Sequence, residues 1–201
     1  MTIAQAQALK DSGRYGMQGG LLSASEMVKL WEVLVDYEYR FHCPAYAVLE
    51  VGHYMGLSTA VLAAIDSRDR EFKVLSIDAH IPDAWVKDSS EETYAANMKS
   101  DHAMGTIQSI TMDSRAVRSI YGFDTVFYDG DHADEQLRFT KVVHESPNVR
   151  LFIFDDRDFP VPVQCCDFLR ANGWRDISPP LLRLNGDKTN PETMTLGVWV
   201  R

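Results

Sequence analysis

The sequence predicts an α/β protein in which a mostly parallel β-sheet lies between two layers of helices. The main observation is a series of short apolar, strand-like runs with helical stretches between them, as βαβ units require. A second observation is a glycine turn that joins the first run directly to a helix. The strand-like runs are Val48–Val51, Val74–Ile77, Ile107–Met112, Thr125–Tyr128 and Leu151–Phe154.

An amphipathic helix over residues 24–41 is predicted to precede the first strand. Residues 23–26, Ser-Ala-Ser-Glu, have the pattern of a capping box, which satisfies backbone groups at a helix start. Apolar residues then follow at the spacing of one helix face. They are Met27, Leu30, Trp31, Leu34 and Val35.

The pattern changes after the fifth strand. A helix is predicted near 162–171 and ends at the Asn-Gly pair of residues 172–173. Two extended segments follow, at about 174–184 and 193–200, and the turn residues Asn-Gly-Asp at 185–187 lie between them. We therefore expect an antiparallel pair of strands at the edge of the sheet.

Length and composition favour one domain. With 201 residues, of which 45% are hydrophobic, the chain is long enough for one well-buried core and too short for two large ones. We expect a single domain over 1–201, with a helical lead-in over 1–45 and the α/β core over 46–201.

Charge and composition also disfavour several classes of partner. The net charge is −9, and no run of five Lys or Arg residues occurs, which disfavours a nucleic-acid partner. No apolar stretch reaches the ~18 residues of a membrane-spanning helix, and residues 1–20 lack the apolar core of a secretion signal. Three cysteines, two of them adjacent, favour a reducing compartment. We expect a cytoplasmic protein that acts on small molecules.

The glycine turn over residues 47–59 is the most informative motif. An apolar run ends in Glu50, Gly52 and Gly56 follow, and small residues then start a helix. A dinucleotide site requires a glycine two residues after the first, so that the backbone can approach a pyrophosphate. Here that position is Tyr54. The pattern therefore disfavours NAD and suits a ligand without a phosphate pair, although any tight turn between strand and helix can require glycines.

An acid lies at the carboxyl end of every predicted parallel strand, either directly after it or, for Glu50, one residue before its end. Because ligands of open α/β sheets lie beyond the carboxyl ends of the strands, these carboxylates are expected to converge, at an electrostatic cost that a cation would offset. Asp78 lies about as far beyond the turn as an acid that accepts hydrogen bonds from a ribose diol, and a helix N-cap is the alternative. The acids are Glu50, Asp78, Asp113, Asp129, Asp155 and Asp156.

The acids of the fourth and fifth strands predict a metal site. Asp129 is expected to lie on a strand next to that of Asp155 and Asp156, and neighbouring strands are ~4.8 Å apart. Three carboxylates suit a hard divalent cation such as Mg²⁺, Mn²⁺ or Ca²⁺. His132 follows Asp129 across a glycine turn and, titrating near neutrality, is predicted to act as a base. The alternative is a surface turn with a solvated histidine.

The pattern Glu-x-Gly-x-x-x-Gly-x-Ser of residues 50–58 resembles the first motif of class I S-adenosylmethionine-dependent methyltransferases, especially the small O-methyltransferases. The resemblance covers about residues 17–200 and implies a Rossmann-like fold with seven strands in the order 3-2-1-4-5-7-6. In that family the glycine turn wraps the methionine part of the cofactor. The implied cofactor-binding residues are Glu50, Gly52, Tyr54, Gly56, Ser58, Asp78, Asp113, Ser114 and Asp129.

Within that set, Asp113 and Ser114 match the position that contacts adenine in the family, although Met112 replaces the usual glycine and an ordinary helix cap is an equal alternative.

The predicted metal ligands resemble those of two types of enzyme in the family. Caffeoyl-coenzyme-A-type enzymes use an Asp with an Asp-Asn pair, and macrolide-sugar O-methyltransferases use Asp-Gly-Ser-His with Glu-Asp, where the histidine is the base. This chain is closer to the second type, with Asp155 as a shorter ligand than Glu.

The expected function is a divalent-metal-assisted methyl transfer from S-adenosylmethionine to a hydroxyl of a small molecule, with His132 and Asp129 as catalytic residues and Asp129, Asp155 and Asp156 as metal ligands. Two alternatives stay open: a metal-binding relative with another reaction, such as the members tied to antibiotic hydroxylation, and a non-catalytic cofactor-binding or scaffold protein. Relatives often form homodimers, and the apolar stripe of helix 24–41 would serve a dimer or its own sheet equally well.

Overall fold

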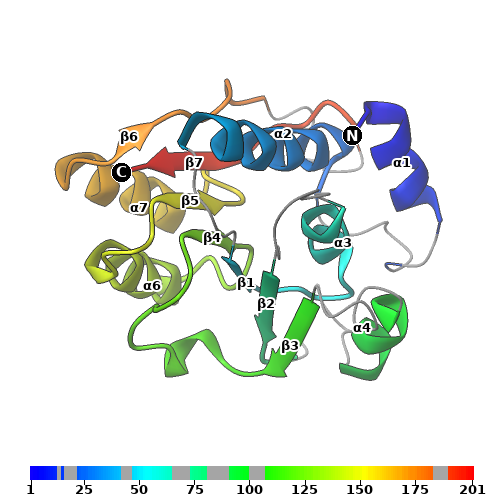
Figure 1. Cartoon of the computed structure of the whole chain (residues 1–201). Coiled ribbons are helices and arrows are strands. Elements are labelled where there is room, and N and C mark those ends of the chain that lie inside the picture. The colour runs from blue at the N-terminus through cyan, green and yellow to red at the C-terminus, as the bar shows by residue number, and fades with distance from the viewer. Residues whose placement is uncertain are drawn as a thin grey trace.

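A computed structural model describes residues 1–12, 15, 22–41, 47–64, 73–80, 91–99, 107–182 and 190–201, with the backbone alone for 37–41. Its centre is a seven-stranded sheet in the order β3-β2-β1-β4-β5-β7-β6 (Figure 1), which confirms the predicted order. The strands are β1 (Ala47–Val51), β2 (Lys73–Asp78), β3 (Ile107–Thr111), β4 (Thr125–Tyr128), β5 (Leu151–Phe154), β6 (Arg175–Asp176) and β7 (Gly197–Val200).

The first five strands run parallel and the last two are antiparallel to their neighbours, as predicted. The first of the two extended segments, 174–184, contributes less strand than expected. It forms the two-residue β6 and an isolated bridge between Leu182 and Met194. The predicted turn at 185–187 lies outside the described residues.

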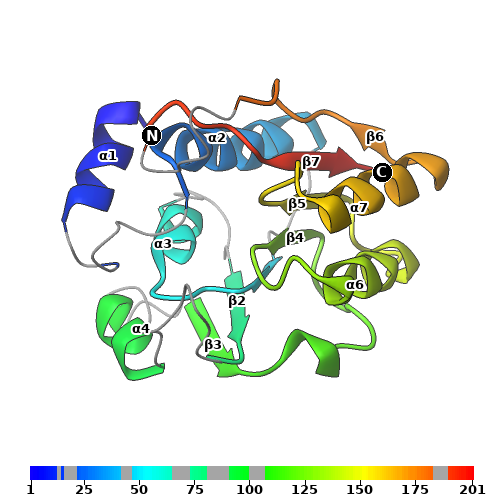
Figure 2. The same cartoon turned by 180° about the vertical axis from the view of Figure 1, so that it is seen from behind.

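Helices cover both faces of the sheet and give a three-layer architecture (Figures 1 and 2). One layer contains α1 (Ile3–Asp11), α2 (Ala24–Phe41) and α3 (Leu57–Ala63), with α4 (Glu91–Asn97) beside it. The other contains α6 (Asp134–Glu145) and α7 (Pro160–Ala171), and η1 (Ser114–Ala116) packs against α6. The helices predicted at 24–41 and 162–171 are therefore present.

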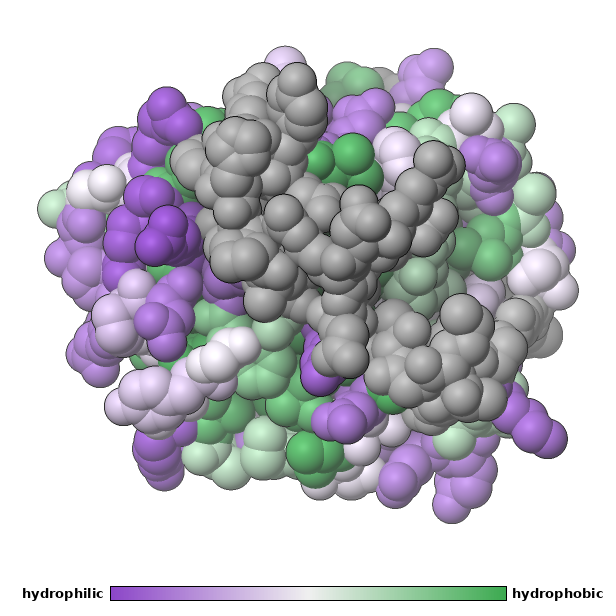
Figure 3. Space-filling view, viewed as in Figure 1, coloured by the Kyte–Doolittle hydropathy of each residue, from purple (hydrophilic) through white to green (hydrophobic). Residues whose placement is uncertain are grey.

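Successive side chains of a strand point to opposite faces of the sheet, and this is why helices pack on both faces. In β4, Phe127 packs into the core on the α2–α3 face, whereas Val126 and Tyr128 pack into the core on the α6–α7 face. A parallel sheet covered on both faces needs apolar residues in both directions, and every residue of β4 and β5 is buried. Hydrophilic side chains gather over the outer side of α6 and α7, at the left of Figure 3.

The predicted capping box starts α2 and also connects this helix to the last strand. Ser23 N–H donates to Glu26 Oε2 (2.8 Å), and Glu26 N–H donates to Ser23 Oγ (3.0 Å). The second carboxylate oxygen of Glu26 accepts hydrogen bonds from Thr195 N–H and Oγ1, just before β7. Among the described helices, none is long and apolar enough to cross a membrane.

Candidate active site at the carboxyl edge of the sheet

The glycine turn after β1 is closely packed against the turn after β4. Gly52 has φ +82°, and a Cβ at this position would lie 2.2 Å from the carbonyl oxygen of Asp129. Gly56, the N-cap of α3, has φ +96°, and its Cβ would lie 2.9 Å from Met98 Cε. Gly52 is therefore required by backbone conformation and by space. Gly56 is required chiefly by its backbone conformation, because Met98 Cε is the end of a flexible side chain.

Unusual backbone conformations gather at the strand ends. Among the described residues other than glycine, three have a left-handed conformation: Tyr54 (φ 47°), His80 (φ 49°) and Asp156 (φ 53°). They follow β1, β2 and β5, whose carboxyl ends share one edge of the sheet. Conformations of this kind tend to cluster at functional sites. The carboxyl edge therefore carries both the predicted acids and the backbone strain.

Glu50 is completely buried and holds the start of α3 against two strands. Its carboxylate accepts hydrogen bonds of 2.6 Å from the hydroxyls of Ser58, Thr59 and Ser76. Burial raises the pKa of Glu50 above its usual value of 4.5, and the three hydroxyls oppose that rise. Glu50 and Ser58, both predicted to bind cofactor, are thus bonded to each other inside the protein.

Asp78, the predicted ribose ligand, ends β2 and binds the backbone of the glycine turn. Its Oδ2 accepts hydrogen bonds from the backbone N–H groups of His53 (3.0 Å) and Tyr54 (2.9 Å), and its Oδ1 accepts one from His80 N–H (2.6 Å). The acid and the turn therefore form one unit. Three of the roughly four acceptor positions of the carboxylate are used in this way.

Two histidines next to Asp78 meet each other. His53 Nε2 lies 3.1 Å from His80 Nε2, and His53 Nδ1 lies 2.7 Å from Ser76 Oγ. Among the described residues, the one set of three His, Cys, Asp or Glu whose ligand atoms all lie within 4.8 Å of one another is His53, Asp78 and His80. Sequence reasoning missed this set, although both histidines follow neighbouring parallel strands by two residues, which is the signal that would have found it.

The acids of β4 and β5 lie at neighbouring strand ends. Tyr128 pairs with Phe154, and the ladder continues from Asp155 N–H to the Tyr128 carbonyl (3.1 Å). Asp155 is 1% exposed, and its Oδ1 accepts from Asp156 N–H (2.8 Å) and lies 3.0 Å from Thr195 Oγ1. The same hydroxyl donates to Glu26 Oε1 at 2.6 Å. One hydroxyl proton therefore serves two buried carboxylates.

The predicted metal ligands Asp129, Asp155 and Asp156 do not form a single group within 4.8 Å in the described part of the chain. They do share an electrostatic environment, because all three carboxylates act on His132. His132 Nε2 lies 3.4 Å from Asp156 Oδ2, and Nδ1 lies 3.2 Å from Gln136 Oε1. The His132 side chain is 26% exposed, so it is neither fully solvated, as in the surface-turn alternative, nor fully buried.

The prediction that His132 titrates near neutrality is wrong for the protein as described. Burial opposes the charge on His132, but the hydrogen bond to Asp156 and the negative charges of Asp129, Asp156 and Asp155 outweigh burial and raise its pKa to about 9. Sequence reasoning placed these acids near His132 and did not follow their effect on its proton affinity. In these surroundings His132 carries a proton at neutral pH.

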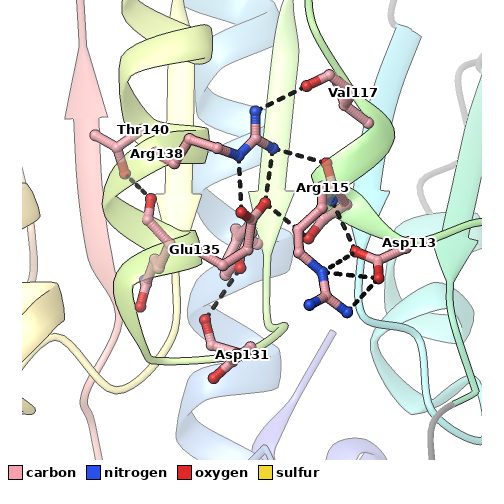
Figure 4. A network of polar contacts seen from close by, with 10 residues as sticks. Asp113, Arg115, Val117, Asp131, Glu135, Arg138 and Thr140 are labelled. Atoms are coloured by element: carbon pink, nitrogen blue, oxygen red, sulfur yellow. Dashed lines mark hydrogen bonds and ion pairs between the residues drawn. The ribbon is translucent and has the colours of Figure 1, made fainter.

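Asp113 and Ser114, predicted to contact adenine, belong to a polar network with α6. Figure 4 labels Asp113, Glu135 and Arg138 in this network. Asp113 caps η1 and forms a two-pronged ion pair with Arg115, whose guanidinium hydrogen bond lowers the pKa of this carboxyl. Ser114 Oγ donates to Glu135, which in turn pairs with Arg138. An open pocket of about 430 Å³ lies beside the network and is lined by Arg115, Asp131, Ala133, Asp134, Glu135 and Arg138.

Part of the chain matches a known family of domains. Residues 49–146, from β1 through α6, match the family model described as a methyltransferase domain. Over these residues the chain is similar to a methyltransferase domain. The matched region contains the glycine turn and the residues Asp78, Asp113, Asp129 and His132. No protein of curated function matches the sequence of the chain.

Solved structures share the fold of this chain at low sequence identity. The cofactor-bound protein Rv0187 from MTB has a TM-score of 0.62 and 15% identity, with 98% of this chain and 88% of that chain covered. The O-methyltransferase TomG from Streptomyces achromogenes, involved in tomaymycin synthesis and solved with SAM, has a TM-score of 0.60 and 16% identity, with the same coverage. An O-methyltransferase from Bacillus cereus in complex with SAH has a TM-score of 0.58 and 14% identity, covering 99% and 90%.

Proposed function

We propose that this chain transfers a methyl group from S-adenosylmethionine to a hydroxyl oxygen of a small molecule, assisted by a divalent cation. The main support for the proposal is that the Asp78 carboxylate is hydrogen-bonded to the backbone of the glycine turn. A nucleoside cofactor would need the acid and the turn side by side in one site. The SAM and SAH present in two solved structures of the same fold support the choice of cofactor.

The proposed cofactor site runs along the strand ends from β1 to β3. Gly52, Tyr54 and Gly56 would contact the methionine part, and Asp78 would offer its remaining acceptor position to a ribose hydroxyl. Asp113 and Ser114 lie at the end of β3, where the adenine is expected. S-adenosylmethionine supplies an already activated methyl group, so the chain needs chiefly to hold the acceptor in line with it.

The proposed cation would bind the oxygen atoms of Asp129, Asp155 and Asp156. The charge distribution fits a cation, since Asp155 and Glu26 share a single hydroxyl proton and Asp156 faces His132. Carboxylate oxygens without thiolates suit Mg²⁺, Mn²⁺ or Ca²⁺. A divalent cation bound there would lower the pKa of an acceptor hydroxyl.

In this proposal His132 is the base that takes the acceptor proton. The surrounding carboxylates hold its pKa at about 9, which opposes the neutral form that a base requires. Positive charge bound among those carboxylates would weaken that effect and lower the pKa. Base function and cation binding are therefore coupled through the same acids.

The test is methyl transfer from labelled S-adenosylmethionine to a panel of hydroxylated small molecules, with Mg²⁺ and with a chelator. We expect a methylated product that depends on Mg²⁺ and is strongly reduced by Asp129→Asn and His132→Gln. His144→Gln is the matched control, because His144 lies at the other end of α6 and contacts Trp174. Methyl transfer that is equal with chelator, or in the Asp129→Asn variant, would contradict the role of the cation.

A further inference from the structure

His53, His80 and Asp78 form a compact group with the chemistry of a transition-metal site. The two Nε2 atoms lie 3.1 Å apart, and the carboxylate of Asp78 has a ligand oxygen within 4.8 Å of both histidines. In a tetrahedral zinc site, Zn–N bonds of 2.0–2.1 Å place two nitrogen ligands roughly 3.3 Å apart. The separation of the two imidazole nitrogens therefore already matches two ligands of one cation.

Neighbouring side chains fix the ring of His53 in the orientation that a ligand requires. Ser76 Oγ donates its only proton to Glu50 Oε2 (2.6 Å), so at the 2.7 Å contact the His53 Nδ1–H donates to Ser76 Oγ. The lone pair of His53 is then on Nε2, the atom that faces His80. The ring also stacks on Tyr94, with centroids 3.7 Å apart and planes 20° apart. Metal-binding histidines are commonly held by such a hydrogen bond from the other ring nitrogen.

The backbone fixes the other two members of the group. His80 has a left-handed conformation, held by the hydrogen bond from its N–H to Asp78 Oδ1. The three backbone N–H groups on Asp78 hold the carboxylate and leave about one acceptor position for a further bond. The side chains of His80 and Asp78 are 9% and 17% exposed. The group is thus rigid and nearly enclosed, as a preorganised metal site is.

We propose that His53, His80 and Asp78 bind a transition-metal cation of the Zn²⁺ type through two imidazole nitrogens and one carboxylate oxygen. This site is separate from the oxygen-only set on β4 and β5, because imidazole ligands select Zn²⁺ and related cations, whereas carboxylates alone suit Mg²⁺ or Ca²⁺. One consequence depends on the proposed function, in which Asp78 binds the ribose of S-adenosylmethionine. Zn²⁺ and S-adenosylmethionine then compete for Asp78.

The first experiment titrates Zn²⁺ alone into the full chain by calorimetry, without S-adenosylmethionine. We expect one Zn²⁺ per chain, and binding weaker by at least about tenfold in His80→Gln. Glutamine keeps the size of the side chain and can still hydrogen-bond His53, so this variant separates metal ligation from the histidine–histidine contact. His144→Gln is the control and should bind as the wild type does.

Cobalt provides a measurement that needs no variant. Co²⁺ added to the wild-type chain is expected to give the visible absorption of a low-coordinate nitrogen–oxygen site, which Zn²⁺ then displaces. The proposal is overturned if the wild-type chain binds no Zn²⁺, or if His80→Gln binds Zn²⁺ as tightly as the wild type while its circular dichroism is unchanged.

The competition is measured separately. Saturating Zn²⁺ should weaken S-adenosylmethionine binding in the wild type and leave it unchanged in His80→Gln. If the wild type binds Zn²⁺ but shows no affinity for S-adenosylmethionine, the proposed function fails and the metal site stands. If Zn²⁺ and S-adenosylmethionine bind together without mutual effect, the shared use of Asp78 is refuted.

Discussion

A Cβ on Gly52 would lie 2.2 Å from the carbonyl oxygen of Asp129, so the turn after β1 and the turn after β4 are in direct backbone contact. The contact joins the two halves of the candidate site: the cofactor half on β1 and β2, and the acidic half on β4 and β5. The glycine of the sequence motif is therefore needed by the protein's own packing, whatever ligand the turn holds.

Gly52→Ala is expected to be severely destabilising. The change adds a left-handed alanine, at about 1–2 kcal/mol, and a clash with backbone that cannot move without shifting β4. We expect a loss of more than about 4 kcal/mol in the free energy of unfolding, which is an exceptional value for a single substitution. Chemical denaturation measures it.

Gly173→Ala is the matched control. Gly173 has the same φ of +82°, and a Cβ there would meet nothing within 4 Å. Its cost should be that of the backbone conformation alone, about 1–2 kcal/mol. If Gly52→Ala and Gly173→Ala lower the free energy of unfolding equally, the close contact of Gly52 with Asp129 does not contribute to stability.

Glu50→Gln is expected to change the pH dependence of stability. Burial raises the folded-state pKa of Glu50 above 4.5, so the wild-type carboxyl contributes most stability below its unfolded pKa and loses that contribution as pH rises through the folded pKa. The free energy of unfolding of wild type, relative to Glu50→Gln, should therefore fall as pH rises above about 4.5. Urea unfolding at a series of pH values measures the difference, and a difference that stays constant or grows with pH would contradict the burial effect.

Thr195→Val removes the hydroxyl between Glu26 and Asp155. The two buried carboxylates then lose their shared donor, and we expect a loss of about 1–3 kcal/mol in the free energy of unfolding. Thr140→Val is the control, since the Thr140 hydroxyl bonds the Gln136 carbonyl within α6 and the Cys165 side chain and not a carboxylate pair. Its removal should lower the free energy of unfolding by about 1 kcal/mol or less. A smaller cost at position 195 than at position 140 would contradict the assigned role of the shared hydroxyl.

The proton affinity of His132 can be measured directly. In the presence of a chelator, an NMR titration should give a pKa of about 9 for this ring. Asp156→Asn removes the hydrogen-bonding carboxylate at 3.4 Å and should lower that pKa. A ring that titrates near its ordinary value of 6.5 in the wild type would mean that the acids of β4 and β5 do not act on it.

The sheet could be predicted from the sequence because short sequence patterns determine most of its elements. The apolar runs, the capping box at Ser23 and Glu26, and the turn glycines each have a short pattern, and the strand order followed from the resemblance of the glycine motif to a known family. The acids at the strand ends were predictable for the same reason, since parallel strands bring their carboxyl ends to one edge.

The partners of those acids could not be predicted. Glu50 is bonded to three hydroxyls, one of them from β2, and this depends on the register between β1 and β2. The positions of His53 and His80, two residues after neighbouring parallel strands, indicate that they lie near each other. Their direct contact also depends on the left-handed backbone of His80, which no sequence pattern indicates. The pKa of His132 depends on a balance between burial and three carboxylates, which composition alone does not determine.

The central claim is that S-adenosylmethionine binds beside the glycine turn and Asp78, and calorimetry on the metal-free chain tests it most directly. We expect one S-adenosylmethionine per chain, strongly weakened binding in Asp78→Asn, and little change in His144→Gln. The absence of binding by a folded wild-type chain, or equal affinity in Asp78→Asn, would contradict the account.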